Sequence, residues 1–318
     1  MIYNLPVMLP LSLRQLQVFE SVARHLNHSR AAAELFLSQP AVSMQIKQAE
    51  QTIGLPLFEQ AGKKLFLTEA GREMLHYARS ILQLMQEMEN VFDAMKGLEH
   101  GRLNITVVST ANYFMPHLLA KFIQAHPKIQ VGLSVANRDA VIRQVADNVA
   151  DLAIMGQPPQ GADMLAESFL ANPLVPIAAP SHPLAHARKI KPQQLAKEVF
   201  LLREKGSGTR AVVERFFDSH ALPLPNHMEM DTNEAIKQSV QAGMGIAIIS
   251  RHAIELELET GRLVVLDALG FPILRDWHIV QRKNKRPSLS AIEFERFLLA
   301  QSHAEIPLNP AVNPRAGK

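Results

Sequence analysis

One face of residues 38–53 carries side chains suited to reading another molecule. If this segment is a helix, that face holds Gln39, Pro40, Ser43, Met44 and Lys47. Glutamine pairs bidentately with adenine, serine bonds to several base edges, an apolar group contacts the thymine methyl, and lysine binds a phosphate. The spacing therefore favours a helix that lies in the major groove of DNA. The alternative interpretation is an ordinary helical hairpin with a solvated polar face.

A second candidate site is the glycine-rich turn Glu204–Arg210, which leads into a helical pattern. Successive backbone amides in such a turn, together with Ser207, Thr209 and flanking cations, suit a phosphate or a carboxylate. The turn lacks the spacing and the Lys-Ser/Thr ending of a P-loop, and the chain has no Gly-x-Ser-x-Gly elbow. We therefore predict no catalytic residue and no enzyme. The alternative for this turn is a capped helix without a ligand.

Histidines offer no metal site in this sequence. His182 and His186 are four residues apart, but Pro183 lies between them in a predicted loop, and the acidic partner of a zinc protease motif is missing. We expect no metal and no bound cofactor.

Two short helical patterns position the first candidate site, and they meet across a three-residue break. Ser29 is placed to cap the first helix and Ser38 the second, where Pro40 is tolerated in the first turn. We count Ser29, Arg30 and Ser38 among the residues expected to contact DNA. Val42, Ile46, Ala49 and Ile53 form an inward apolar face on the second helix. This pattern is typical of a helix-turn-helix.

The flanking segments complete a winged unit. Leu13–His25 has the apolar spacing of a third helix, which the motif needs for a core. Residues 55–68 predict a β-hairpin around Ala61 and Gly62, with Lys63 and Lys64 near its tip. A basic wing beside the second helix would contact the phosphate backbone.

This part of the chain closely resembles the LysR-type transcriptional regulators. The motifs that carry the resemblance are Leu16–Phe19, Ala31–Ala33, Ser38–Ser43, Gln45, Ile46, Glu50, Leu57, Phe58 and Leu67–Gly71. Ala49 stands where the family usually has leucine, and Gln60 where it usually has arginine, so Lys63 and Lys64 are left to supply the charge of the wing. The resemblance implies a homo-oligomer, dimeric and further tetrameric, that binds double-stranded promoter DNA and a small-molecule effector. RNA polymerase is a further expected partner.

Composition agrees with this interpretation without requiring it. The chain has 318 residues, a net charge of +3 and no cysteine, which excludes disulfides and thiol-based redox sensing. No run of about 18 apolar residues is present, and the N-terminus lacks the pattern of an export signal. We therefore expect a soluble, cytoplasmic protein with no membrane partner.

Residues 68 to about 96 predict one long helix with a heptad pattern of apolar residues. The members of this seam are Met74, Ala78, Ile81, Met85, Met88, Phe92 and Met95. A stripe of this length favours pairing with the same helix of a second chain. The alternative is packing against the chain's own C-terminal domain. Gly97 and Gly101 mark the end of the helix and a linker.

Beyond Gly101, strands alternate with helices in two successive blocks; Leu103–Val108 reads as a strand and Met115–Ala125 as a helix. The resemblance implies a domain like the periplasmic binding proteins, with two subdomains and a cleft. We thus expect a multi-domain α+β protein: a winged helix-turn-helix over 1–67, a linker helix over 68–100, a two-subdomain α/β effector domain over 101–301 and a disordered tail over 302–318. Subdomain I is expected at 101–163 and 268–301, and subdomain II at 164–267, with chain crossings near 160–165 and 265–270.

Polar residues at strand ends and helix starts would converge in that cleft. The candidates in the first block are Ser109, Thr110, Asn112, Asn137 and Arg138. Those in the second block are Arg203, Glu204, Ser207, Gly208, Thr209 and Asn233. For each single segment the alternative is again a capped helix with no ligand.

The glycine-rich turn and residues 233–249 look most like the Calvin-cycle branch of the family, which regulates RuBisCO operons in autotrophic bacteria. That branch implies activation by a phosphorylated or nucleotide metabolite, and the alternative is another metabolic operon with a carboxylate effector. A solute-binding protein would explain residues 101–300 equally well. It would not explain the helix-turn-helix, the seam or the missing export signal.

Overall fold

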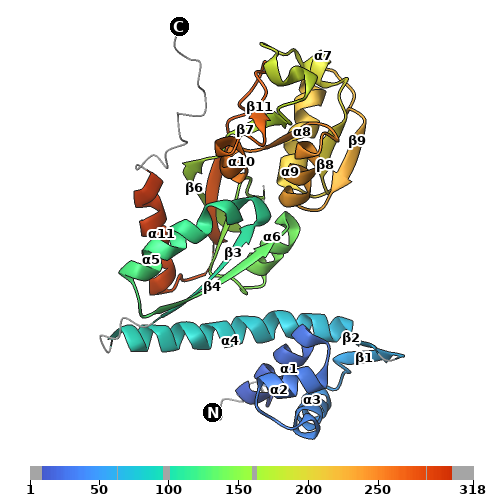
Figure 1. Ribbon diagram of the computed structural model, residues 1–318. Coiled ribbons are helices and arrows are strands. Elements are labelled where there is room, and N and C mark those ends of the chain that lie inside the picture. Colours follow the sequence, from blue (N-terminus) through green and yellow to red (C-terminus); the bar gives the residue numbers. More distant parts are fainter. Residues whose placement is uncertain (1–8, 63, 96–100, 160–162, 284, 303–318) are drawn as a thin grey trace. The chain divides into compact units, whose positions relative to one another are not determined.

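The computed structural model describes residues 9–62, 64–95, 101–159, 163–283 and 285–302 (Figure 1). The chain divides into two compact units, Met1–Met95 and Lys96–Lys318. Lys63, residues 96–100 and residues 303–318 of the expected tail lie outside the described residues, as does the side chain of Met95, whereas Ser302, the first residue of that expected tail, ends the last helix. None of the described helices combines the length and the apolar composition needed to cross a bilayer.

The N-terminal unit begins with three helices, α1 (Leu13–His25), α2 (His28–Glu34) and α3 (Gln39–Ile53). Ser12 opens α1 with a capping box, in which its hydroxyl accepts from the Gln15 amide and the Gln15 side chain accepts from the Ser12 amide. Ser38 caps α3 by accepting from the Ala41 amide at 3.3 Å, and Gly54 ends α3 in the left-handed region at φ 80°.

The start of α2 corrects one expectation. Asn27, not Ser29, is the N-cap, and its side-chain oxygen accepts from the amides of Ser29 and Arg30 at 2.9 and 3.0 Å. Ser29 lies inside the first turn. Asparagine caps as well as serine does, and the cap belongs to the residue that precedes the first helical turn.

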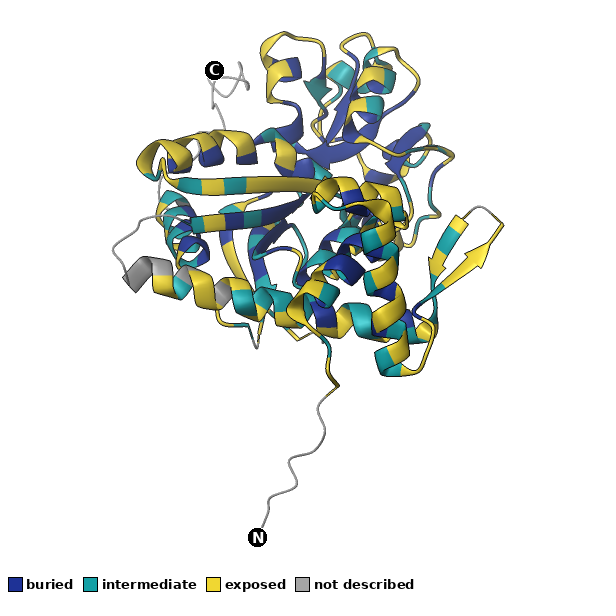
Figure 2. Cartoon of the chain, turned by 90° about the horizontal axis from the view of Figure 1, so that it is seen from below, coloured by how far each residue is buried: buried dark blue, intermediate teal, exposed yellow. Residues whose placement is uncertain are grey.

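A two-stranded hairpin, β1 (Phe58–Ala61) and β2 (Lys64–Leu67), follows the helices and pairs Phe58 with Leu67. Both strands are exposed along much of their length (Figure 2). Beneath the hairpin, the three helices and the next one enclose a core. Its fully buried members are Val18, Phe19, Val22, Ala31, Val42, Ala49, Leu57 and Ala78. The Glu50 carboxylate accepts from the amides of Leu57 and Phe58, and so fixes the chain between α3 and β1.

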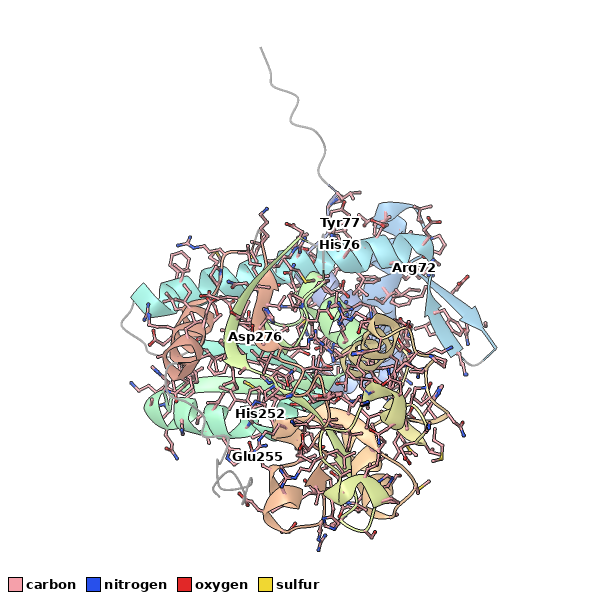
Figure 3. The ribbon with its side chains drawn as sticks, turned by 90° about the horizontal axis from the view of Figure 1, so that it is seen from above. Arg72, His76, Tyr77, His252, Glu255 and Asp276 are labelled. Atoms are coloured by element: carbon pink, nitrogen blue, oxygen red, sulfur yellow. The ribbon has the colours of Figure 1, made fainter. Side chains whose placement is uncertain are left out.

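Helix α4 (Glu69–Met95) runs for 27 residues and begins in this core. Ala78 is fully buried there, and Met74 packs against the same core. These two members of the expected seam are therefore covered by the chain's own α1 rather than left for a partner. Further along, Tyr77, Ile81, Leu84, Met88 and Phe92 are exposed. Tyr77 follows Arg72 and His76 along the helix (Figure 3).

The second unit contains two subdomains, one built on a single sheet and the other on two. Subdomain I has a five-stranded sheet of order β4-β3-β5-β12-β6, formed by β3 (Gly101–Val108), β4 (Ile129–Ala136), β5 (Leu152–Met155), β6 (Met164–Ala171) and β12 (Asp276–Arg282). Strands β3, β4 and β5 are parallel, and β12 runs antiparallel to β5 and β6. Helices α5 (Met115–Ala125) and α11 (Leu289–Ser302) share one core with the sheet, and α6 (Arg138–Ala146) a second core (Figure 1).

Subdomain II carries the strands and helices between the two chain crossings. Its strands are β7 (Leu174–Ala178), β8 (Phe200–Arg203), β9 (His227–Met230), β10 (Ala247–Ser250) and β11 (Val264–Val265). Its helices are α7 (Pro192–Leu195), α8 (Gly208–Ser219), α9 (Asn233–Gln241) and α10 (Glu255–Glu259), with 3₁₀ turns η2 (Pro183–His186) and η3 (Arg251–Ala253). A third such turn, η1 (Ser109–Tyr113), follows β3 in subdomain I. The sheet orders are β10-β7-β11 and β8-β9.

The crossings between the subdomains differ from those expected. Strand β6 pairs with β12 in the first sheet, so the chain leaves subdomain I at Asn172, beyond the expected 160–165. It returns at Arg275, beyond the expected 265–270. The two crossings run side by side, because the Asn172 amide donates to the Arg275 carbonyl at 2.6 Å and the Leu174 amide to the Ile273 carbonyl at 3.0 Å. The chain crosses only after β6 has paired in the sheet of subdomain I. The periodicity of the sequence does not show which sheet a strand joins.

Candidate nucleic-acid interface and ligand cleft

The expected DNA-reading face of α3 is open to solvent. Gln39, Pro40, Met44 and Lys47 are exposed, and Met44 leaves 54% of its surface accessible. Ser43 is half-buried and accepts a hydrogen bond from Gln39 Nε2 at 3.0 Å. The opposite face, with Val42, Ile46 and Ala49, is buried, as a docking helix requires.

Other expected DNA contacts surround this helix. Ser29 and Arg30 are exposed in the first turn of α2, and Lys64 is exposed at the start of β2. Ser38 is exposed while its hydroxyl caps α3. A helix N-terminus also presents free backbone amides, which suit a phosphate. The described residues thus offer a polar helix face flanked by cations and by a hairpin.

In the second unit, a cleft lined by residues of both subdomains lies between them. Nine of the residues expected from the sequence line it: Ser109, Thr110, Asn137, Arg138, Arg203, Glu204, Ser207, Gly208 and Thr209. Asn233 lies behind the wall and bonds to two of them. Asn112 does not line the cleft and is exposed on η1.

The local sequence explains how these residues reach the cleft. Asn137 caps α6 by accepting from the Ala140 amide at 2.9 Å, which places Arg138 at the first helical position. Gly206 adopts φ 88° before Ser207 opens α8, a conformation that favours glycine. Two helix N-termini, of α6 and α8, therefore border the same space.

The hydrogen bonds of Arg203 serve mainly to link the two subdomains rather than to bind a ligand. Its guanidinium donates to both Glu204 oxygens at 2.7 and 2.9 Å and to Asn233 Oδ1 at 2.7 Å. Asn233 Nδ2 then donates to Thr110 Oγ1 of subdomain I at 3.1 Å. The charge of Arg203 is thus neutralised by Glu204, and the polar chain joins β8 to η1 across the cleft.

A second buried ion pair, Lys237 with Glu257, lies near these hydrogen bonds. Lys237 Nζ on α9 donates to Glu257 at 2.8 Å, pairs with Glu234 at 3.0 Å and lies 4.7 Å from the ring centre of Tyr113 on η1. Burial lowers the pKa of Lys237, but the two carboxylates outweigh it and raise that pKa overall. Subdomain I therefore contacts α9 through both Thr110 and Tyr113.

Arg275 is the main cleft residue that sequence reasoning missed. Its guanidinium donates to the Gly156 carbonyl at 3.1 Å, to Gln157 Oε1 at 2.9 Å and to the Gly208 carbonyl at 3.4 Å. All of these partners are neutral, and no described carboxylate pairs with it. Burial, and then repulsion from Arg215 and Arg138, lowers the pKa of Arg275 to about 10. The group stays charged at neutral pH, and no acidic side chain in the described part of the chain neutralises it.

Arg275 escaped prediction for a topological reason. It precedes β12, whereas the cleft residues predicted from the sequence follow strands or open helices. Because β12 is antiparallel to β5, its first residues lie beside the carboxyl end of β5. The sequence does not state the direction of β12. The other lining residues that were not predicted are Val108, Met155, Gly156, Gln157, Asn172, Leu174 and Trp277.

A winged helix-turn-helix joined to a two-subdomain ligand cleft defines a class, the ligand-responsive bacterial transcription regulators. Residues 13–72 match the bacterial regulatory helix-turn-helix protein model of the lysR family, and residues 96–302 match the LysR substrate binding domain. The chain belongs to the LysR family of DNA-binding transcription regulators. This confirms the resemblance and the fold class predicted from the sequence.

Individual relatives narrow the comparison. A RuBisCO operon transcriptional regulator of Allochromatium vinosum is 52% identical over 92% of this chain and 96% of its own length. The HTH-type transcriptional regulator CbbR of Rhodospirillum rubrum is 48% identical over 92% and 97%. The regulatory domain of Synechocystis CcmR, solved in complex with 2-PG, is 39% identical and covers 65% of this chain and 99% of that one, with a TM-score of 0.62. These relatives are regulators, not enzymes.

Proposed function

We propose that this protein activates transcription of a RuBisCO operon when a small phosphorylated or otherwise anionic metabolite binds in the cleft. Relatives at 48 and 52% identity are named as regulators of this kind, and a 39% identical domain was solved with 2-PG. The observation that carries the effector class is Arg275, a half-buried cation whose described partners are all neutral.

The surroundings of Arg275 support an anion. Arg138 lines the same cleft, and the N-terminal turn of α8 adds Gly208 and Thr209. Partial burial of a guanidinium without a counter-ion is unfavourable, and an anionic ligand reduces that penalty. Bidentate recognition by arginine suits both phosphate and carboxylate, so the charge is specified more tightly than the chemical identity.

In this proposal the effector changes the angle between the subdomains, since its contacts come from both. The linker helix of each subunit carries the change to the spacing of the DNA-binding units in a dimer or tetramer. Activation then involves contact with RNA polymerase at the promoter, in the cytoplasm. DNase I footprints on the promoter of a RuBisCO operon test this step; equal footprints with and without a binding metabolite would contradict it.

The effector test is calorimetric titration of the full-length protein with 2-PG, ATP and malonate. We expect at least one of the phosphorylated compounds to bind, and Arg275→Gln to weaken it at least about tenfold, because charge-assisted hydrogen bonds are lost. Arg188→Gln is the matched control, since Arg188 is an exposed arginine of subdomain II that does not line the cleft and pairs only loosely with Asp267 at 4.0 Å. Equal affinities of wild type and Arg275→Gln would overturn the proposed site, and binding of malonate alone would favour a carboxylate effector.

A further inference from the structure

A short hydrogen-bonded chain leads from α2 to the DNA-reading face of α3. His28 Nδ1 lies 3.1 Å from Ser43 Oγ, and Gln39 Nε2 donates to the same oxygen at 3.0 Å. His28 is the first residue of α2, held there by the Asn27 cap, and its ring meets that of Phe58 edge-on at 6.3 Å. Gln39 and Ser43 are one turn apart and point to the same side of α3.

The direction of the hydrogen bonds follows from the other nitrogen of His28. Nε2 is buried, and no described group bonds to it. A buried N–H without an acceptor is rarer than an acceptor without a donor, so the proton belongs on Nδ1, where it donates to Ser43 Oγ. Burial also lowers the pKa of His28, against a smaller opposing effect of the Glu50 carboxylate, so the ring is neutral at pH 7.

This arrangement fixes the polarity of both exposed groups. With His28 and Gln39 donating to it, Ser43 Oγ has both lone pairs in use and can only donate its own hydrogen outward. Gln39 must then turn its NH₂ toward Ser43 and keep its carbonyl oxygen free. A glutamine with this amide orientation presents one N–H and one oxygen to adenine N7 and N6. Without His28, the Ser43 hydroxyl can donate to Gln39 Oε1, and the amide can flip.

We propose that His28 is a positioning residue that sets the base specificity of α3 through Ser43 and Gln39 without touching DNA. The inference relies on the exposed face of α3 entering the major groove. It extends the reading surface to a residue on a different helix. It also predicts which base-edge atoms are read, an acceptor opposite Ser43 and an adenine opposite Gln39.

The test is selection from a randomised DNA duplex library with the full-length protein, followed by affinity measurements on the selected sequence and on its single-base variants. We expect His28→Leu to lose roughly five- to tenfold of the preference at the base pair read by Gln39, the size of one hydrogen-bonded contact. His28→Asn keeps an N–H near the position of Nδ1, so it should stay within about twofold of wild type. The salt dependence of binding should not change in either variant, because phosphate contacts are untouched.

Two further variants separate positioning from stability. Ser43→Ala and the double variant with His28→Leu should select the same motif, since His28 acts only through Ser43. His25→Asn, at a histidine that pairs with Glu34 and does not contact Ser43, should select the wild-type motif.

Three results would overturn the proposal. If His28→Leu selects the wild-type motif, the positioning role of His28 is refuted, while base reading by α3 is not. Uniform weakening at every base pair, shared by His28→Asn, indicates a purely structural histidine. A wild-type protein that selects no motif at all refutes base reading by α3, and the role of His28 with it.

Discussion

At the scale of single residues, the partners of a cation decide its role better than its type does. Arg203 and Arg275 both line the cleft, yet Arg203 donates to both oxygens of Glu204 while Arg275 has only neutral partners. Arg210, which was expected only as the end of the glycine-rich turn, is buried and pairs with Glu214 and Glu229. The hydrogen bonds that Arg210 donates to these carboxylates raise its pKa, despite its burial. Charge neutralisation thus separates the structural arginines Arg203 and Arg210 from Arg275, which is available to a ligand.

His28 gives the N-terminal unit a predictable response to acid. Burial lowers its pKa from 6.5 in the folded protein, so the unfolded chain binds the proton more readily. Stability should therefore fall as the pH drops through about 6.5 toward the folded pKa, and should be unaffected by His28 above that range. Urea unfolding of wild type and His28→Asn at pH 7.5 and 5.5 tests this, and the wild type should lose more stability. Equal losses in the two proteins would contradict the assignment.

At the scale of elements, the N-cap residues fix where a helix begins and therefore which residue occupies its first position. Asn27 caps α2 and thereby places His28 at its first position, and Ser38 caps α3 and places Gln39. In the second unit, the Asn137 cap does the same for Arg138. In each case the capping side chain fixes where the helix begins, and the first helical residue is one to which we assign a functional role.

The cap of α2 can be tested with two neighbouring substitutions. Asn27→Ala should cost about 1 kcal/mol of stability, because two amides lose their acceptor. Ser29→Ala should cost only a few tenths, since Ser29 lies within the helix and does not cap it. Chemical denaturation of the full chain, with hydrogen exchange of the α2 amides, measures both. A larger loss for Ser29→Ala would restore the cap expected from the sequence.

The sequence predicted features that depend on neighbouring residues better than features that depend on contacts between distant segments. Leu13–His25 and Met115–Ala125 were predicted with their observed ends, because periodicity and caps are local signals. The nine cleft residues were predicted because strand ends of parallel sheets converge. Arg275, the β6 pairing and the crossing at Asn172 depend on which distant strand lies alongside, and no local pattern contains that information. The His28–Ser43 contact joins two helices and was missed for the same reason.

At the scale of the whole molecule, the N-terminal unit has an exposed apolar surface that does not pack into its own core. In the N-terminal unit this is the exposed part of α4, with Ile81, Leu84, Met88 and Phe92. An apolar stripe on a helix of this length favours a second copy of the chain. The stripe begins after Ala78, where the chain's own core ends.

Pairing through α4 can be tested by placing a charge in the stripe. Ile81→Glu should shift the protein toward monomers, because a carboxylate would be buried at the helix pair. The same charge at exposed Gln86, on the opposite side of α4, should leave association unchanged. Sedimentation velocity at a series of concentrations distinguishes these outcomes. An unchanged dimer for Ile81→Glu would place the interface elsewhere.

The burial of Ala78 also has a mechanical consequence. Because Met74 and Ala78 in the first turns of α4 belong to the core around α1, we expect the helix and the DNA-reading helices to tilt together. The 27 residues of α4 span about 40 Å. Over that length, a tilt of about 5° at one end displaces the other by about 3.5 Å, which is close to the rise of one base pair. α4 is therefore a lever long enough to turn a small angular change into a one-base-pair change of register on DNA.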